Sequence, residues 1–405
     1  MATEATQTPL IRKPSAKPTI GWIIGIAALA LAALYPVLYE EMLGEMSIPV
    51  FREWPSVSTA VIMIVFTMMA VGLNIVVGYA GLLDLGYVAF YAVGAYTAGW
   101  LASGHFQQVK IHILSSGVAA DLRGIHVNLW VVLLIAGTIT AVAGILIGLP
   151  TLRLRGDYLA IVTLGFGEII PQFVRNADNL GGFNLTAGTF GINPIDSPGF
   201  GTALNDSLGL PISFQQSFEK INLFYWSALV LLLFTIFCSI RLRGSRLGRA
   251  WIAIREDETA AAAMGVPLMR TKTAAYALGA FFGGIAGAFY ASFKGGAFPS
   301  EFFFNISVFL LCMVILGGMG SVWGVVLAGL ILTYLNQEGL SNIGGWLNNE
   351  TPLDFEVAKY QFGIYGVIIV LMMLFRPVGL IPEGRRKQEI QEGTATDTLY
   401  GERHE

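Results

Sequence analysis

The sequence predicts an all-α polytopic membrane protein, and three observations support this prediction. Of the 405 residues, 55% are hydrophobic and only 13% are charged, whereas soluble domains carry about 25% charged residues. The apolar residues form runs close to the roughly 20 residues that a helix needs to cross a bilayer. The clusters of Lys and Arg between these runs all fall on one side of the membrane when the runs are threaded through it.

The apolar runs predict about ten transmembrane helices within a domain of residues 20–382. They lie at about 20–39, 57–77, 83–103, 128–148, 157–176, 223–240, 272–293, 303–319, 321–337 and 360–376. The third and fifth runs contain polar residues and glycines. The first run is longer than the apolar core of a signal peptide, so we expect a retained helix. Tails of residues 1–19 and 383–405 flank this domain.

The distribution of basic residues predicts that both termini are cytoplasmic. With the N-terminus inside, the basic loop at 241–271 and the run Arg385-Arg386-Lys387 lie on the same side, as do Arg153 and Arg155. This agreement requires an even number of spans. The long segment 177–222 then lies outside. It is either a landing surface for a soluble partner or a solvated loop.

Several functions find no support in the residues. The net charge of −3 does not indicate binding to nucleic acid, and no Gly-x-x-x-x-Gly-Lys-Ser/Thr loop indicates binding of ATP. The four histidines lack zinc-ligand spacing, and no nucleophile–base pattern stands out. We therefore expect a chain that is not an enzyme and has no metal or cofactor of its own. Cys238 and Cys312 are expected to be buried apolar residues. Energy for transport would come from another subunit or from an ion gradient.

Glycines are abundant and occur in patterns. Gly279, Gly283 and Gly287 recur every four residues, which favours close helix packing over a substrate path along this face. GYAGLLDLGYVAFYAVGAYTAG begins at residue 78, and VILGGMGSVWGVVLAGL begins at residue 314. Both place clustered glycines before a small-residue helix. This similarity suggests two internal repeats, 57–176 and 272–376.

Three polar residues within the apolar runs are candidates for a transport pathway: Asn74, Asp84 and Glu168. Asp84 sits in a glycine-rich run, where capping of the following helix is favoured over substrate contact. Glu168 lies about eleven residues after Asp157, roughly 16 Å along a helix and near the middle of the membrane. A carboxylate there needs a partner, a cavity or water. Glu168 either lines a pathway or hydrogen bonds to another helix.

The segment RLRGSRLGRAWIAIREDETAAAAMGVPLMRTK, residues 241–272, is the most charged part of the chain. Strong helix formers occupy Arg249 to Met264, Asp257 can cap a second short helix from Glu258, and Gly265 and Pro267 terminate it. We expect two short helices parallel to the membrane, a surface suited to a cytoplasmic partner. The alternative is a solvated loop helix.

The same segment carries a resemblance. GRAWIAIREDETAAAAMGVPLMRTKTAAYALGAFFGGIAGAFYASFKG resembles the cytoplasmic loop and following helix of LIV-type permease subunits of bacterial ABC importers for branched-chain amino acids. GDYLAIVTLGFGEII and VILGGMGSVWG resemble two further family signatures. The resemblance covers about residues 57–382 and is nearest to the M-type subunit. In the outer loop, this chain has Leu185-Thr186-Ala187-Gly188 where the family often has Leu-Thr-Gly-Gly.

The resemblance implies an inner-membrane assembly. A second homologous permease pairs with this chain, two ATPase subunits consume ATP below it, and a periplasmic binding protein delivers branched-chain amino acids from above. Glu258–Gly265 resembles the coupling helix of ABC importers, although Thr259 departs from the Glu-Ala-Ala pattern. The residues implied to couple to the ATPases are Arg249, Arg255, Glu256, Glu258, Ala260 and Gly265.

Two alternatives remain open. Related permeases are associated with urea, amides or other amino acids, so the substrate is not determined by the resemblance. A different class, an ion-coupled secondary carrier acting alone, would want paired charges in mid-membrane. Glu168 has no evident basic partner within the spans.

Overall fold

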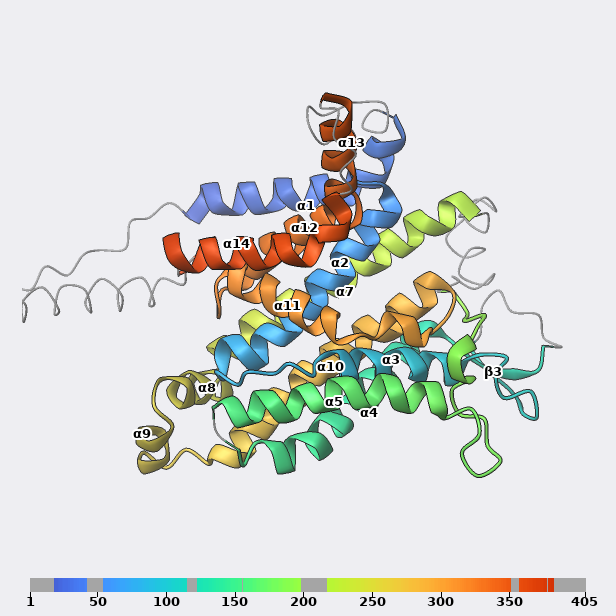
Figure 1. Cartoon of the computed structure of the whole chain (residues 1–405), viewed down its shortest axis with the longest axis horizontal. Coiled ribbons are helices and arrows are strands. Elements are labelled where there is room, and N and C mark those ends of the chain that lie inside the picture. The colour runs from blue at the N-terminus through green and yellow to red at the C-terminus, as the bar shows by residue number, and fades with distance from the viewer. Residues whose placement is uncertain are drawn as a thin grey trace, which may run out of the picture.

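A computed structural model shows a bundle of long helices with a small sheet at one end (Figure 1). The structure describes residues 18–41, 54–114, 122–154, 156–197, 217–350, 357–376 and 378–381. Several predicted features therefore lie outside the described residues: residues 1–17 of the N-terminal tail, the whole C-terminal tail 383–405 with Arg385–Lys387, Arg155, and residues 198–216 of the outer segment.

A helix lies at each of the ten predicted spans. The helices at these positions are α1 (Pro18–Glu41), α2 (Val57–Asn74), α3 (Val88–Leu101), α4 (Leu129–Thr151), α5 (Asp157–Asn176), α7 (Ser217–Gly244), α10 (Leu268–Lys294), α11 (Phe304–Gly317), α12 (Val322–Tyr334) and α14 (Gln361–Phe375). Two π-helical turns extend α2 and α12: η2 (Ile75–Tyr79) and η6 (Leu335–Gly339). The latter continues into α13 (Leu340–Glu350).

Five helices of the described chain are long and apolar enough to cross a membrane. They are Val57–Tyr79, Leu129–Thr151, Ile221–Gly244, Leu268–Lys294 and Pro299–Gly317. Three shorter apolar stretches, Ala27–Glu40, Val88–Leu101 and Gln361–Phe375, accompany them. The all-α polytopic fold class is confirmed. The number of ten spans stays a prediction.

The predicted third span begins later than expected. Residues 80–87 are not helical, and α3 begins only at Val88. The expected cap by Asp84 is wrong, because Tyr87 occupies the N-cap position without a side-chain cap bond. Asp84 Oδ1 instead accepts a hydrogen bond from the Gly86 amide at 2.8 Å, which closes a turn before the helix.

In each of the two segments that we predicted as repeats, the first helix packs against helices of the other segment. The first helix of the later segment, α10, packs chiefly against α4 and α3 of the earlier one. The first helix of the earlier segment, α2, packs against α12 and α11 of the later one, as well as against α7 and α10. Because each segment supplies the central helix of the other, the two form one inseparable core.

Glycines on α10 allow this close packing. A Cβ at Gly279 would collide with the Val76 side chain, one at Gly283 would lie 3.1 Å from the Tyr87 ring, and one at Gly287 would overlap the Tyr91 carbonyl oxygen. The three residues thus face α2, η2 and α3. Small residues at these positions let helix backbones approach closely.

The two ends of the bundle differ. The short helices α8 (Arg246–Glu256) and α9 (Glu258–Ala263) lie at one end, on the left of Figure 1. A three-stranded sheet that the sequence did not predict lies at the other end. Its strands are β1 (Ala102–Ser103), β2 (Lys110–Ile113) and β3 (Gly124–Val127), with β3 in the middle. The 3₁₀ turns η3 (Gly188–Phe190), η5 (Pro299–Glu301) and η7 (Val357–Tyr360) complete the elements.

Candidate functional site

The helix pair α8–α9 is the best-defined candidate site. The predicted cap and end of α9 are confirmed, whereas α8 begins at Arg246, three residues before the predicted Arg249. Asp257 caps α9, because its Oδ1 accepts hydrogen bonds from the amides of Thr259 (2.7 Å) and Ala260 (3.0 Å). Gly265 ends α9 with a φ of +84°, a conformation that favours glycine. Its amide and that of Val266 bond back to α9 in a Schellman arrangement.

A buried tryptophan anchors this pair to the bundle. Trp251 of α8 is fully buried, and its indole Nε1 donates to the Thr271 carbonyl at 2.8 Å. Glu258 at the start of α9 forms an ion pair with Lys272 of α10, at 2.8 Å. The Lys272 side chain is almost fully buried, whereas that of Glu258 is 31% exposed. The helix pair α8–α9 is therefore attached to α10 through a hydrogen bond from α8 and an ion pair from α9.

The outward face of this helix pair carries other predicted coupling residues. Arg249, Glu256 and Ala260 are exposed, as is Gly265. The neighbouring Met264 has 86% of its surface exposed. Arg249 Nη1 donates to the Gly244 carbonyl at 3.0 Å, so its guanidinium lies over the end of α7. The face combines charge with an exposed flexible apolar side chain, which is typical of protein-binding surfaces.

Arg255 differs from the other predicted coupling residues because it points into the bundle. Its guanidinium donates to the Gly78 carbonyl of η2 at 2.5 Å. Arg255 is half-buried, and its side chain packs against Gly81, where a Cβ would lie 2.8 Å from Arg255 Cγ. The Arg255 side chain therefore links α8 to the end of α2–η2.

The three pathway candidates are not brought together. Asn74 is fully buried at the end of α2, where its Oδ1 accepts from the Gly320 amide at 2.9 Å. Asp84 is also buried, close to the Tyr276 hydroxyl. Glu168 is exposed on α5. Only Glu168 is accessible from outside this chain.

The exposed position of Glu168 follows from the packing of α5. This helix contacts α3 and α11 on one side, and a Cβ at Gly86 would collide with the Thr163 carbonyl there. On the opposite face Ile161, Glu168 and Gln172 are exposed. Pro171 lies inside α5, which continues through it. Within the described residues no hydrogen bond or ion pair engages the Glu168 carboxylate, so a bond to another helix of this chain does not explain it.

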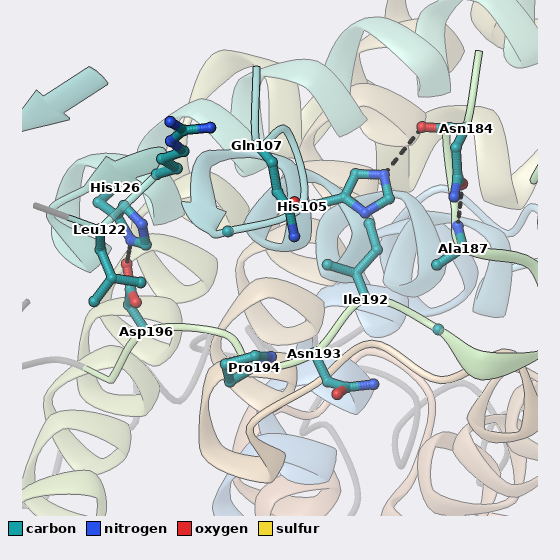
Figure 2. Close-up of a pocket in the computed structure, with 13 residues that line it drawn as sticks. His105, Gln107, Leu122, His126, Asn184, Ala187, Ile192, Asn193, Pro194 and Asp196 are labelled. Carbon is teal, nitrogen blue, oxygen red and sulfur yellow. Dashed lines mark hydrogen bonds and ion pairs between the residues drawn. The ribbon is translucent and has the colours of Figure 1, made fainter. Parts of the chain in front are cut away.

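A second site, which the sequence reasoning missed, lies at the opposite end of the bundle. Figure 2 shows a cavity of about 920 Å³ lined by His105, His126, Asn184 and Asp196, among others. His126 Nδ1 lies 2.7 Å from Asp196 Oδ2, and His105 Nε2 lies 3.0 Å from the Asn184 carbonyl. Burial raises the pKa of Asp196, and the hydrogen bond with His126 partly offsets this effect. The pair fastens the segment after α5 to the sheet.

The residues of this cavity gave little signal in the sequence. His126 was considered only as a zinc ligand, and its partner lies 70 residues away. The Leu185-Thr186-Ala187-Gly188 stretch gave a stronger hint. Ala187 adopts φ +58°, a left-handed conformation that favours glycine. This geometry suits the glycine that the resemblance led us to expect at position 187.

A search of protein families gives an independent result. Residues 56–375 match the family described as branched-chain amino acid transport system / permease component. The chain belongs to this family of permease components. The match covers α2 to α14 and therefore includes the core formed by both segments, α5 and the α8–α9 pair.

Individual relatives of this permease agree. The chain is 36% identical over 358 residues to the high-affinity branched-chain amino acid transport system permease protein LivM of Salmonella typhimurium, covering 84% of this chain and 75% of that protein. LivM of Escherichia coli K12 gives the same values. LivH of Salmonella typhimurium is 28% identical over 176 residues, covering 43% of this chain and 51% of LivH. No solved structure matches the chain.

Proposed function

We propose that this chain is the M-type permease subunit of an ABC importer that moves leucine, isoleucine and valine across a bacterial inner membrane. One structural observation carries the proposal: a family member bears a doubly capped, exposed helix pair, α8–α9, anchored to its central helix α10. The names of the similar LivM proteins supply the substrate class. Urea, amides and other amino acids remain the competing substrates.

We assign each expected partner to one face of the molecule. The α8–α9 face, with Arg249, Glu256, Glu258 and Ala260, docks the ATPase subunits in the cytoplasm. The exposed face of α5, which carries Glu168, meets the second permease, and the similarity to LivH supports a homologous partner of this kind. The cavity at the sheet end receives the periplasmic binding protein. The positive-inside rule supports this orientation, because Arg241, Arg243, Arg246 and Arg249 lie at the α8 end.

Glu168 is the residue that we assign to the pathway. A carboxylate exposed on the side of a membrane helix is too costly to face lipid and requires water or a polar partner. Leucine, isoleucine and valine carry an ammonium group, which a carboxylate attracts. Asn74 and Asp84 are enclosed by this chain, so we assign them structural roles instead.

The decisive experiment substitutes Glu258→Arg in the complete transporter in proteoliposomes. The comparison with wild type measures ATP-dependent leucine uptake and copurification of the ATPase subunits. We expect both to be lost. Normal values of both would remove Glu258 from the coupling surface.

The ion pair with Lys272 requires a control. The exchange variant Glu258→Lys/Lys272→Glu restores the pair with reversed charges. If Glu258 acts by docking the ATPase, this exchange will not restore uptake. Full restoration would assign Glu258 to the fold of this chain alone. A wild-type assembly that moves urea or another amino acid but no leucine would contradict the assignment of the substrate. It would leave the assignment of the docking surface unchanged.

A further inference from the structure

The structure brings together three features that are far apart in the sequence: Arg255 of α8, Asn74 of α2, and the glycine turn before α12. All three meet at the π-helical turn η2. The Arg255 guanidinium reaches the Gly78 carbonyl, and Asn74 Oδ1 accepts from the Gly320 amide at 2.9 Å. The Tyr79 hydroxyl also lies 2.9 Å from Ser239 Oγ of α7.

Arg255 caps the C-terminal end of the continuous helix α2–η2 by donating a hydrogen bond to the Gly78 carbonyl. The last carbonyls of a helix lack partners within it and carry partial negative charge, so a cation is favourable there. The Gly78 carbonyl is one of these groups, and after it the chain turns away at Gly81 with φ +68°. A residue of the α8–α9 surface therefore caps a helix of the buried core.

On its other side, η2 is in direct contact with the turn before α12. A Cβ at Gly78 would lie 2.6 Å from the Gly320 nitrogen and 2.8 Å from Asn74 Cγ. The next residue, Ser321, is the N-cap of α12, where its Oγ accepts from the Gly324 amide at 3.2 Å. The end of η2 is thus in direct contact with the turn that starts α12.

We propose that η2 is a mechanical joint that couples α8 to α12, with Arg255 and Asn74 as its positioning residues. η2 ends the long helix α2 as a π-helical turn, and such local irregularities occur frequently at functional sites. The proposal rests on the proposed function, because it assigns to η2 the transmission of movement from the ATPase-docking surface. Its direct evidence is the continuous chain of contacts from Arg255 through Gly78 and Asn74 to Gly320.

The first test measures uptake of leucine and hydrolysis of ATP in the same proteoliposomes with the whole transporter. Arg255→Ala and Asn74→Leu are each expected to raise the ATP hydrolysed per leucine transported about tenfold, the size expected for loss of one hydrogen bond to a charged or buried group. Because both act on one joint, the double variant is expected to be no worse than the more severe single variant. Arg246→Ala is the matched control, since Arg246 is an exposed arginine of the same helix.

Uptake and hydrolysis that fall by the same factor would overturn the joint, because that result indicates a structural role only. Additive effects of the two substitutions would overturn it as well. A wild-type assembly that neither takes up leucine nor hydrolyses ATP would instead contradict the proposed function.

The second test does not depend on transport. Hydrogen–deuterium exchange of the purified chain reports on the Gly320 amide, which Asn74 protects. Arg255→Ala is expected to increase exchange in residues 317–321, because Arg255 holds η2 at Gly78 and η2 contacts this turn. Arg246→Ala is expected to leave it unchanged. Equal exchange in the Arg255→Ala and wild-type proteins would overturn the joint even if Asn74→Leu fails to assemble.

Discussion

Helices α10 and α5 both contain glycines and lie in the same bundle, yet the surroundings of these glycines are opposite. A Cβ at Gly287 of α10 would overlap the Tyr91 carbonyl oxygen, whereas one at Gly165 of α5 would meet nothing within 4 Å. Gly279 and Gly283 of α10 are buried, but Glu168 of α5 is exposed. The comparison teaches that α10 is covered on its glycine face by its own chain, whereas this chain leaves one face of α5 uncovered, the face that we propose for the second permease.

The largest effect is expected when this contrast is broken at Gly287. Gly287→Leu forces a side chain against the backbone of α3 and should lower the free energy of unfolding by more than about 3 kcal/mol, the upper part of the range for overpacking. We expect aggregation or loss of the monodisperse peak in detergent gel filtration. The matched variant Gly165→Leu should keep that peak. Equal behaviour of the two variants would contradict the packing of α10.

A smaller effect is expected from the charge on α5. Glu168→Gln preserves the size of the side chain and removes its charge, so the fold should be unchanged while leucine uptake falls about tenfold, as for loss of a charge-assisted hydrogen bond. The measurement is the initial rate of uptake by the whole transporter, with thermal stability recorded alongside. Glu168→Asp serves as the charge-preserving control. An unchanged rate in Glu168→Gln would exclude the carboxylate from the pathway.

The smallest effect is expected from Gly165→Ala, which tests whether a partner covers the open face of α5. Gly165→Ala replaces a residue of poor helix propensity at an open position and should stabilise the isolated chain by about 0.5–1 kcal/mol. If the partner permease packs closely on this face, the same methyl group should destabilise the assembly. Thermal unfolding of both forms tests this difference. Stabilisation of both by the same amount would show that the second permease does not approach Gly165.

Local chemistry explains which features were predictable. Asp257 and Gly265 were placed correctly because a helix cap depends on residues within one turn. Asp84 was assigned wrongly because the same carboxylate also closes an Asx turn, and only the late start of α3 distinguishes the two. The short strands of the sheet gave no periodic pattern long enough to detect. Their pairing depends on contacts such as that of Ser103 with Ile125.

Other features are beyond any reading of a single chain. The sequence predicts that Glu168 lies in mid-membrane but does not show which side of α5 is covered, because that depends on α3 and α11. The link between Arg255 and Gly78 joins residues 177 positions apart. Arg255 looked like its exposed neighbours, since residue type alone does not distinguish a docking arginine from one that caps a distant helix.

The packing of α2 and α10 against helices of the other segment has a consequence for synthesis of the protein. Nearly every residue of α2 is buried, and its principal partner α12 follows about 250 residues later. At roughly 5–20 residues per second, the ribosome takes on the order of 10–50 s to supply that partner. During this interval the buried polar groups of α2, such as Thr67 and Asn74, have only lipid, insertion machinery or provisional neighbours beside them. Truncated or stalled chains should therefore be prime substrates for membrane proteases.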